Sequence, residues 1–381
     1  MASHNDDRPP VSLAALLADM PDPRVERTRL HRLDEIIILT MIAVVCGADD
    51  WVAVETYGEA NEAWLKEFLE LPNGIPSHDT LGRVFRMIDP TELSTRLGRW
   101  LEALQEPVED DQVCVDGKTL RRSLDSASGK APLHVVNAWA AGARVFLGQL
   151  GVDGKENEIV AIPRLLKLLD LKKRLVTLDA MGCQKEIARV VVEGGGHYLL
   201  RVKDNQPTLH AEMRTFFLDA ERDGFRLQKW SSYEETDGDH GRIEVRKTWA
   251  CDDLSWFEDR AKWANLCSVV VQRNRREAKG KVTESLHIYI CTRPAKDVER
   301  LAVAARRHWA IENELHWVLD MAFDEDWSRV RRDNAPLNLA AIRRHAASIL
   351  KKNTTLKIGV ANRRRAAGWN RDILIRTLLG R

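Results

Sequence analysis

The 381-residue sequence contains no long apolar run and no recognisable leader segment. Its longest apolar stretch, Ile36 to Ala48, is flanked by acidic residues and is too short to span a bilayer. The first residues, Met1 to Asp7, have neither the basic region nor the apolar stretch of a signal peptide. We therefore expect a protein that is not associated with a membrane and is located in the cytoplasm.

Cysteine is also sparse: the six cysteines are widely spaced, and no two of them form a CxxC pair. This spacing argues against a zinc knuckle, and a cytoplasmic location would keep the thiols reduced. Hydrophobic residues make up 44% of the chain and charged residues 30%, as is usual for a soluble globular protein. The length allows one large domain or two to three smaller ones.

The formal net charge is only +1, but the charge is distributed unevenly. Residues 327–381 contain fourteen Lys and Arg against two Asp, so the preceding part of the chain is acidic. A basic C-terminal segment on an acidic body favours a polyanionic partner, although a solvated helix face is the alternative. The densest basic run consists of Arg363, Arg364 and Arg365.

Helical apolar spacing dominates the chain up to residue 107 and predicts an all-helical N-terminal domain, residues 1–107. Residues 108–206 instead have the pattern of three strands, a helix, a strand, a helix and a further strand. This order matches the first part of an RNase H-like core with a mixed sheet. The five strands are predicted at Val113–Asp116, His134–Ala140, Arg144–Val152, Leu175–Asp179 and His197–Lys203.

Residues 207–295 are rich in Trp, Thr and Val and predict a β-rich insertion subdomain. Helices return in residues 296–350, which we expect to complete the core, and residues 351–381 form the basic C-terminal segment. The fold class is therefore α/β: an RNase H-like core interrupted by a β-rich insertion and flanked by helices. The predicted late helices are Asp297–Asp320, Ala335–Lys351 and Arg371–Leu379.

Three acidic residues stand at positions suited to a metal site. Asp116 and Asp179 end two predicted strands, and Glu312 lies on a predicted helix. Phosphodiester cleavage and strand joining require two divalent cations roughly 4 Å apart, held by hard oxygen ligands that suit Mg²⁺ or Mn²⁺. Any one of these acids alone would be read as a turn or surface residue, but the three in this order favour a two-ion metal site.

Glu312 has competitors on the same segment. Glu314 is two residues away and would face elsewhere on a helix, whereas His308, Glu312 and His316 share one face. A zinc site built from the histidines is the alternative, but no HExxH motif supports it. We expect the histidines to flank the carboxylate and contact phosphate. The nearby tryptophans, Trp309 and Trp317 beside Glu312 and Trp327 further on, are expected to pack the helix onto the core. Stacking on a flipped or frayed base at a DNA end is the alternative.

Basic and polar residues follow the acids closely in the sequence and are candidates for binding phosphate oxygens. Exposed, ion-paired side chains are the alternative interpretation for each one. Together with the C-terminal arginines, the candidate DNA contacts are Lys118, Arg121, Arg122, Lys203, Asn205, His240, Arg242, His308, Asn313 and His316.

These motifs resemble those of the H-repeat-associated group of DDE transposases from bacterial insertion sequences. The similar segments extend over nearly the whole chain and keep a fixed order, so the resemblance is highly specific. In the N-terminal part they are Asp22–Arg24, Cys46–Ala48 and Gly74–Thr80. In the remainder they are Val115–Arg121, Leu178–Gln184, Lys203–Gln206, His240–Arg242 and His308–Trp317.

The resemblance implies that Asp116, Asp179 and Glu312 hold the two catalytic Mg²⁺ or Mn²⁺ ions. Related hairpin-forming transposases carry a Tyr, Arg, Glu, Lys signature around the glutamate. Here Ala305, His308 and Leu319 occupy the Tyr, Arg and Lys positions. A hairpin intermediate is therefore not carried over to this chain.

We interpret the chain as a transposase that cuts double-stranded DNA at terminal inverted repeats with water and joins the freed 3′-hydroxyl to target DNA. The N-terminal helices and the basic C-terminal segment would recognise the ends, in a homodimer that synapses two of them. Such a bacterial protein would be nucleoid-associated when bound to DNA. The alternatives are a domesticated, catalytically silent DNA-binding relative and an RNase H-like nuclease acting in repair or on RNA.

Overall fold

The computed structural model describes residues 12–104, 108, 111–124, 129, 131–152, 157–239 and 242–380. Its N-terminal part is helical, as predicted. The side chains of Asp50, Ser77 and Asp89 cap three of these helices by accepting hydrogen bonds from backbone N–H groups in the first turn. The helices are α1 (Leu13–Leu17), α2 (Leu33–Val45), α3 (Trp51–Leu65), α4 (His78–Met87) and α5 (Pro90–Ala103).

A mixed nine-stranded sheet crosses the middle of the molecule in the order β3-β2-β1-β4-β5-β9-β8-β7-β6. The predicted succession of three strands, helix, strand, helix and strand is confirmed. β1 pairs antiparallel with β2 and parallel with β4, and β4 pairs parallel with β5. These elements are β1 (Gln112–Leu120), β2 (Leu133–Ala140), β3 (Val145–Val152), α6 (Glu158–Leu166), β4 (Leu175–Leu178), α7 (Lys185–Glu193) and β5 (His197–Val202).

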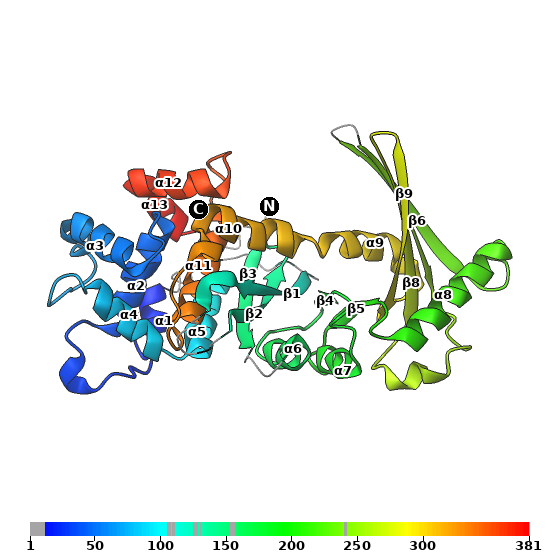
Figure 1. Cartoon of the computed structure of the whole chain (residues 1–381), viewed down its shortest axis with the longest axis horizontal. Helices are drawn as coiled ribbons and strands as arrows, with labels where there is room; N and C mark the ends of the chain where they lie inside the picture. The colour runs from blue at the N-terminus through cyan, green and yellow to red at the C-terminus, as the bar shows by residue number, and fades with distance from the viewer. Residues whose placement is uncertain are drawn as a thin grey trace, which may run out of the picture.

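The region predicted as a β-rich insertion does contain four strands, but it begins with a 16-residue helix that was not predicted. The strands also form no separate sheet, because β9 pairs with β5 and extends the same sheet. Figure 1 shows the long β6–β9 hairpins at the end of the molecule opposite the N-terminal helices. The elements are α8 (Pro207–Arg222), β6 (Trp230–Asp239), β7 (Arg242–Cys251), β8 (Ser268–Ala278) and β9 (Lys281–Cys291).

The continuous helix predicted over Asp297–Asp320 is interrupted. α9 (Val298–Arg307) ends before Glu312, a π-helical segment spans Ile311–His316, and α10 (Trp317–Phe323) follows. π-Helical turns widen the helix and are frequent at functional sites. The chain then forms α11 (Ala335–Lys352), α12 (Val360–Trp369) and α13 (Arg371–Leu378).

Two faces of the sheet are covered by different helices because successive strand residues point to opposite sides. Val176 and Leu200 share a core with α6 and α7, whereas Leu175 and Leu199 pack with α9. α11 is buried along almost its whole length and joins one hydrophobic core with α1–α5 and α10. The N-terminal helices therefore share their core with the C-terminal part of the chain. Within the described residues, no helix is both long and apolar enough to cross a membrane.

Candidate active site

Asp116 and Asp179 are brought to the same edge of the parallel strand pair. Val115 of β1 pairs with Leu178 of β4, and the residue that follows each of them in the sequence is one of the two aspartates. The carboxyl ends of parallel strands form the usual site for polar functional groups in such sheets. β1 continues beyond Asp116 because its antiparallel pairing with β2 continues to Leu120, four residues further than predicted.

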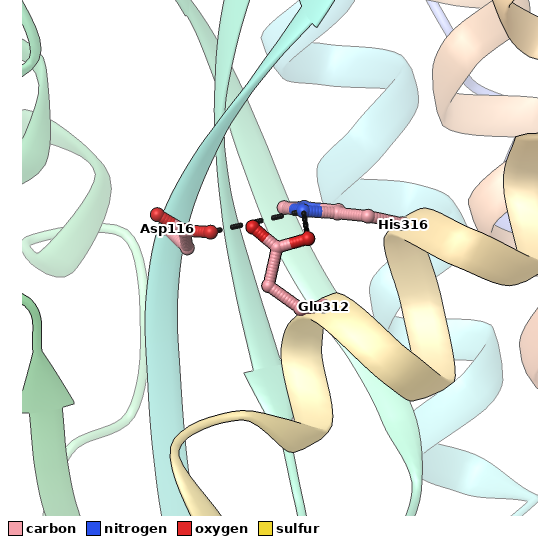
Figure 2. A group of neighbouring side chains, drawn as sticks. All are labelled: Asp116, Glu312 and His316. Atoms are coloured by element: carbon pink, nitrogen blue, oxygen red, sulfur yellow. Dashed lines mark ion pairs between the residues drawn. The ribbon is translucent and has the colours of Figure 1, made fainter. Parts of the chain in front are cut away.

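Glu312 reaches Asp116 from the π-helical segment that lies against β1. Figure 2 shows the carboxylates of Asp116 and Glu312 directed toward one another, with the imidazole of His316 beside them. His316 Nδ1 is 3.4 Å from Glu312 Oε2 and 3.7 Å from Asp116 Oδ2. One ligand atom from each of the three residues lies within 4.8 Å of the others. This spacing suits a single cation held by the two carboxylates.

The surroundings shift the pKa values of the two carboxyl groups in opposite directions. Burial raises the pKa of Asp116 to about 8, and the neighbouring Glu312 adds to this effect. Hydrogen bonding to His316 lowers the pKa of Glu312 to about 2, and hydrogen bonding to Asp116 adds to this effect. Adjacent carboxylates of this kind share one proton unless a cation neutralises them. The pair therefore fits a divalent cation on chemical grounds as well as on distance.

Asp179 lies further out. It lines a hollow of about 270 Å³ together with Asp116 and Glu312, but it is outside the three-residue cluster. Its Oδ1 accepts a hydrogen bond from the backbone N–H of Met181 at 3.1 Å, which orients the exposed carboxylate. Its negative charge also contributes to the raised pKa of Asp116. The structure thus brings all three predicted acids to one hollow, with Asp179 outside the cluster of the other two.

The Nε2 side of His316 contacts a buried polar network that could not be predicted from the sequence. Asn137 Nδ2 faces His316 Nε2 at 3.4 Å, and Arg344 Nε donates to Asn137 Oδ1 at 2.6 Å. Arg344 also forms an ion pair with Glu325 at 2.6 Å. Because Asn137 Oδ1 is occupied by Arg344, its Nδ2 must donate to His316 Nε2. Nδ1 of His316 then carries the proton that points to the carboxylates.

The competitors of Glu312 point elsewhere. Glu314 forms ion pairs with Arg144 at 2.9 Å and Lys351 at 3.8 Å, so the prediction that it faces away is confirmed. His308 Nδ1 lies 3.0 Å from Thr177 Oγ1 and lines the hollow, but it does not belong to the three-residue cluster. His316 is buried against the carboxylates. Its side chain therefore has no exposed surface for the phosphate contact that we expected from the sequence.

The basic candidates near the acids have different surroundings. Lys118 is nearly buried and pairs with Asp320 at 2.7 Å, while Arg121 pairs with Asp326 at 3.2 Å. The Arg122 guanidinium lies 3.8 Å from the centre of the Trp327 ring. Lys203 is exposed and lines the hollow, as does the half-buried Arg201.

Three further candidates lie near the surface. Asn313 is exposed, Asn205 donates to Ala180 O at 2.6 Å, and Arg242 pairs with Glu244 at 2.9 Å. His240 lies outside the described residues. Of the candidate DNA contacts that the structure describes, only Lys203 and His308 line the hollow that contains the three acids, and Arg201 lines it as well.

The C-terminal arginines are largely structural. Arg364 is buried, pairs with Asp49 at 2.7 Å and donates to the carbonyls of Val44, Ala48 and Ala322. Arg363 donates to the carbonyls of Leu350, Lys351 and Leu356. Arg365 remains exposed and contacts only Asn362 among the residues described. Arg364 is therefore removed from the set of DNA contacts, because it ties α12 to α2 and α10.

The prediction that the tryptophans pack onto the core is wrong. Trp309, Trp317 and Trp327 are all more than half exposed, at 61%, 61% and 63%. Trp309 lines the hollow beside Glu312. Flat aromatic surfaces that remain in solvent next to a polar site are available for contact with a ligand.

The mixed α/β fold agrees with the comparison to known families. Residues 107–349 match the transposase DDE domain, and residues 14–101 match the domain described as DDE_Tnp_1-associated. The chain belongs to the DDE transposase family, in the H repeat-associated group, as its motifs predicted.

Individual relatives are similar over most of their length. The chain is 37% identical to "Putative transposase YncI" of Escherichia coli O157:H7 over 94% of this chain and 92% of that protein. It is 35% identical to "H repeat-associated putative transposase YhhI" of E. coli K12, over 95% and 96% respectively. A shorter match, 42% identical over 17% of this chain and 76% of the relative, is to "Inactive transposase YbfQ" of E. coli K12.

Proposed function

We propose that this protein is an active transposase that cuts DNA at terminal inverted repeats and joins the new 3′ ends to target DNA. The observation that carries the proposal is the pairing of the half-buried Asp116 with Glu312, because two adjacent carboxylates call for a cation. A decayed site would have no reason to keep two carboxylates and an oriented imidazole within 4.8 Å.

Asp116, Asp179 and Glu312 are the proposed ligands for two Mg²⁺ or Mn²⁺ ions. Such ions, when bound, activate the attacking oxygen and stabilise the leaving oxygen in phosphoryl transfer. The hollow lined by Asp179 and by the Asp116–Glu312 pair is the proposed place of the scissile phosphate, because all three acids face it. The order of β3, β2, β1, β4 and β5 supports an RNase H-like core for this arrangement.

Other side chains at the site would orient Glu312 and bind the DNA. Neutral His316 donates its Nδ1 proton toward Glu312 and holds that carboxylate in place. Arg201 and Lys203, which line the hollow at the end of β5, are suited to bind phosphate oxygens of the cut strand. Trp309 offers an exposed ring at the same hollow for contact with a base next to the cut.

The test is cleavage of duplex DNA that carries candidate element ends, with and without Mg²⁺, and with products mapped on both strands. The proposal expects end-specific cutting that is lost in Asp179→Asn, whose DNA binding is retained. Binding without cutting by the unaltered protein would favour the silent DNA-binding alternative instead. Cutting that ignores the end sequence would favour a nuclease.

The proposed partners are double-stranded DNA at the element ends and at the target, bound by a homodimer that brings two ends together. Two ends must be cut in concert for an element to move, so one active site per end is the simplest arrangement. In a cell this places the protein on the nucleoid while it is bound. Crosslinking in the presence of two labelled ends would report the dimer.

A further inference from the structure

A large groove lies outside the acidic site. It has a volume of about 1120 Å³ and runs between α4, the start of α3 and residues 324–335. Six arginines line it, against four aspartates: Arg83, Arg86, Arg329, Arg331, Arg332 and Arg343. Its walls are therefore basic, although the chain as a whole is nearly neutral.

Several of the acids in the groove are already engaged. Asp49 forms an ion pair with Arg364 at 2.7 Å, and Asp50 accepts a hydrogen bond from Ala53 N to cap α3. On the basic side, Arg86 pairs with Asp333 at 2.8 Å. Arg83, Arg329 and Arg332 are exposed and form no ion pair with any residue that the structure describes. The groove thus presents an excess of uncompensated positive charge.

A buried arginine among the lining residues gives a second, independent indication. Arg343 is 2% exposed, its Nε has no hydrogen-bond partner among the described atoms, and one terminal nitrogen donates to Asp49 O at 2.6 Å. The two acids that act on it from further away, Glu325 and Asp49, each pair with another arginine. A buried guanidinium without its own counter-ion is costly, and an anion in the groove would offset that cost.

The groove also leads toward the acidic site. Trp327 lines it, and the face of the Trp327 ring carries the guanidinium of Arg122 at 3.8 Å. Arg331, another lining residue, donates to Arg122 O at 3.2 Å. Arg122 follows β1, the strand that carries Asp116 and the ion-paired Lys118. A chain of charged and aromatic side chains therefore connects the groove to the cluster of carboxylates.

We infer that this groove binds one phosphodiester backbone of duplex DNA and directs it past Trp327 toward Asp116. Cations on both walls suit a strand of phosphates that lies between them, since each wall can neutralise a different set of oxygens. The inference rests on the proposed function for the identity of the polyanion. It goes further by assigning the DNA path to Arg83 and Arg86 of α4 and to residues 329–332, none of which belongs to the motifs recognised in the sequence.

The test measures DNA binding by the full chain in EDTA, so that no cleavage occurs. A fluorescent 30-base-pair duplex carrying an element end is titrated at several NaCl concentrations. The test variant is Arg329→Ala/Arg332→Ala. Its matched control is Arg214→Ala/Arg226→Ala, which removes the same charge from exposed positions on and just after α8, at the opposite end of the molecule. The lysine double variant, Arg329→Lys/Arg332→Lys, retains the charge.

The groove variant should lose at least tenfold in affinity, and the slope of log affinity against log salt should fall by about 2, or roughly 0.9 per lost phosphate contact. The α8 control and the lysine variant should keep the slope of the unaltered protein. An unchanged slope in the groove variant would overturn the inference, as would an equal loss in the α8 control. Either result leaves the cleavage test of the proposed function untouched, so the two failures are distinguishable.

Discussion

Arg344 and Glu325 form a fully enclosed ion pair, with side chains 0% and 1% exposed and a nitrogen–oxygen distance of 2.6 Å. Arg344 extends from α11 toward the sheet, where it also holds Asn137 and, through it, His316. The pair therefore connects the core of the helical end of the molecule to the group that orients Glu312. Its integrity should matter to both stability and metal binding.

Removing one partner of this pair leaves an uncompensated buried charge. We expect Glu325→Gln to lower the free energy of unfolding by about 3–5 kcal/mol. The exposed pair Arg86–Asp333 provides the control, since Asp333→Asn should cost less than about 1 kcal/mol. Urea denaturation followed by circular dichroism measures both. Equal effects of the two substitutions would contradict the structural role assigned to Arg344.

Asn137 should act as a positioning residue for the metal site. Asn137→Asp keeps an oxygen for Arg344 but replaces the donor that faces His316 Nε2 with an acceptor. His316 must then take up a second proton, and its positive charge would compete with the cation. We expect the Mg²⁺ concentration for half-maximal cleavage to rise about 10- to 100-fold, with a small change in melting temperature. An unaltered Mg²⁺ requirement would show that the Asn137 contact does not govern the imidazole.

The raised pKa of Asp116 predicts how the metal-free protein responds to pH. In the unfolded chain this carboxyl has the ordinary value of 3.8, and in the fold it is raised to about 8. The folded state then binds more protons between these values, so the contribution of Asp116 to stability is lost as pH rises toward 8. With EDTA present, the unaltered protein should lose stability between pH 6.5 and 8 relative to Asp116→Asn.

Mg²⁺ should abolish that difference in slope, because the bound cation favours the ionised carboxylate and its binding releases the proton. The buried histidines do not account for a change of stability between pH 6.5 and 8. Burial lowers the pKa values of His308 and His345 to about 4, so their effect on stability is confined to more acidic solution. Thermal melts at pH 6.5, 7.2 and 8 measure the slopes. Parallel curves for the two proteins would count against a shared proton at Asp116.

Substitutions of the C-terminal arginines Arg364 and Arg365 should differ in their effect on the free energy of unfolding. Arg364→Ala leaves Asp49 and three backbone carbonyls without their partner, and we expect a loss of about 3 kcal/mol. Arg365→Ala should change stability by less than about 0.5 kcal/mol, since that side chain is exposed. Denaturant titrations of the two variants give the comparison. A mild effect at Arg364 and a severe one at Arg365 would reverse the assignment.

Much of the site could be predicted because its signals are local. The runs before Asp116 and Asp179 are short, apolar and rich in β-branched residues, and parallel pairing then places the two acids at one edge. Glu312 could be chosen over Glu314 because the direction of a helical side chain follows from its spacing. Within the β-rich region, β6 carries no clear alternation of apolar residues, so its position could not be predicted.

Other features depend on contacts between distant parts of the chain. Arg344 and Asn137 are 207 residues apart in sequence, so no local pattern joins them. The π-helical segment at Glu312 has the apolar spacing of an ordinary α-helix, so its widened turns could not be predicted from the sequence. Arg364 sits in a basic run, and its burial follows from the carbonyls that α2 and α10 present to it. Charge alone could not distinguish it from Arg365.

The most direct measurement is the cleavage of duplex DNA carrying element ends by the unaltered protein and by Asp116→Asn, Asp179→Asn and Glu312→Gln. The account predicts Mg²⁺-dependent cutting at the ends by the unaltered protein, and a loss of at least a hundredfold in each variant with DNA binding retained. Undiminished cutting by any of the three variants would contradict the assignment of these acids to one metal-dependent site.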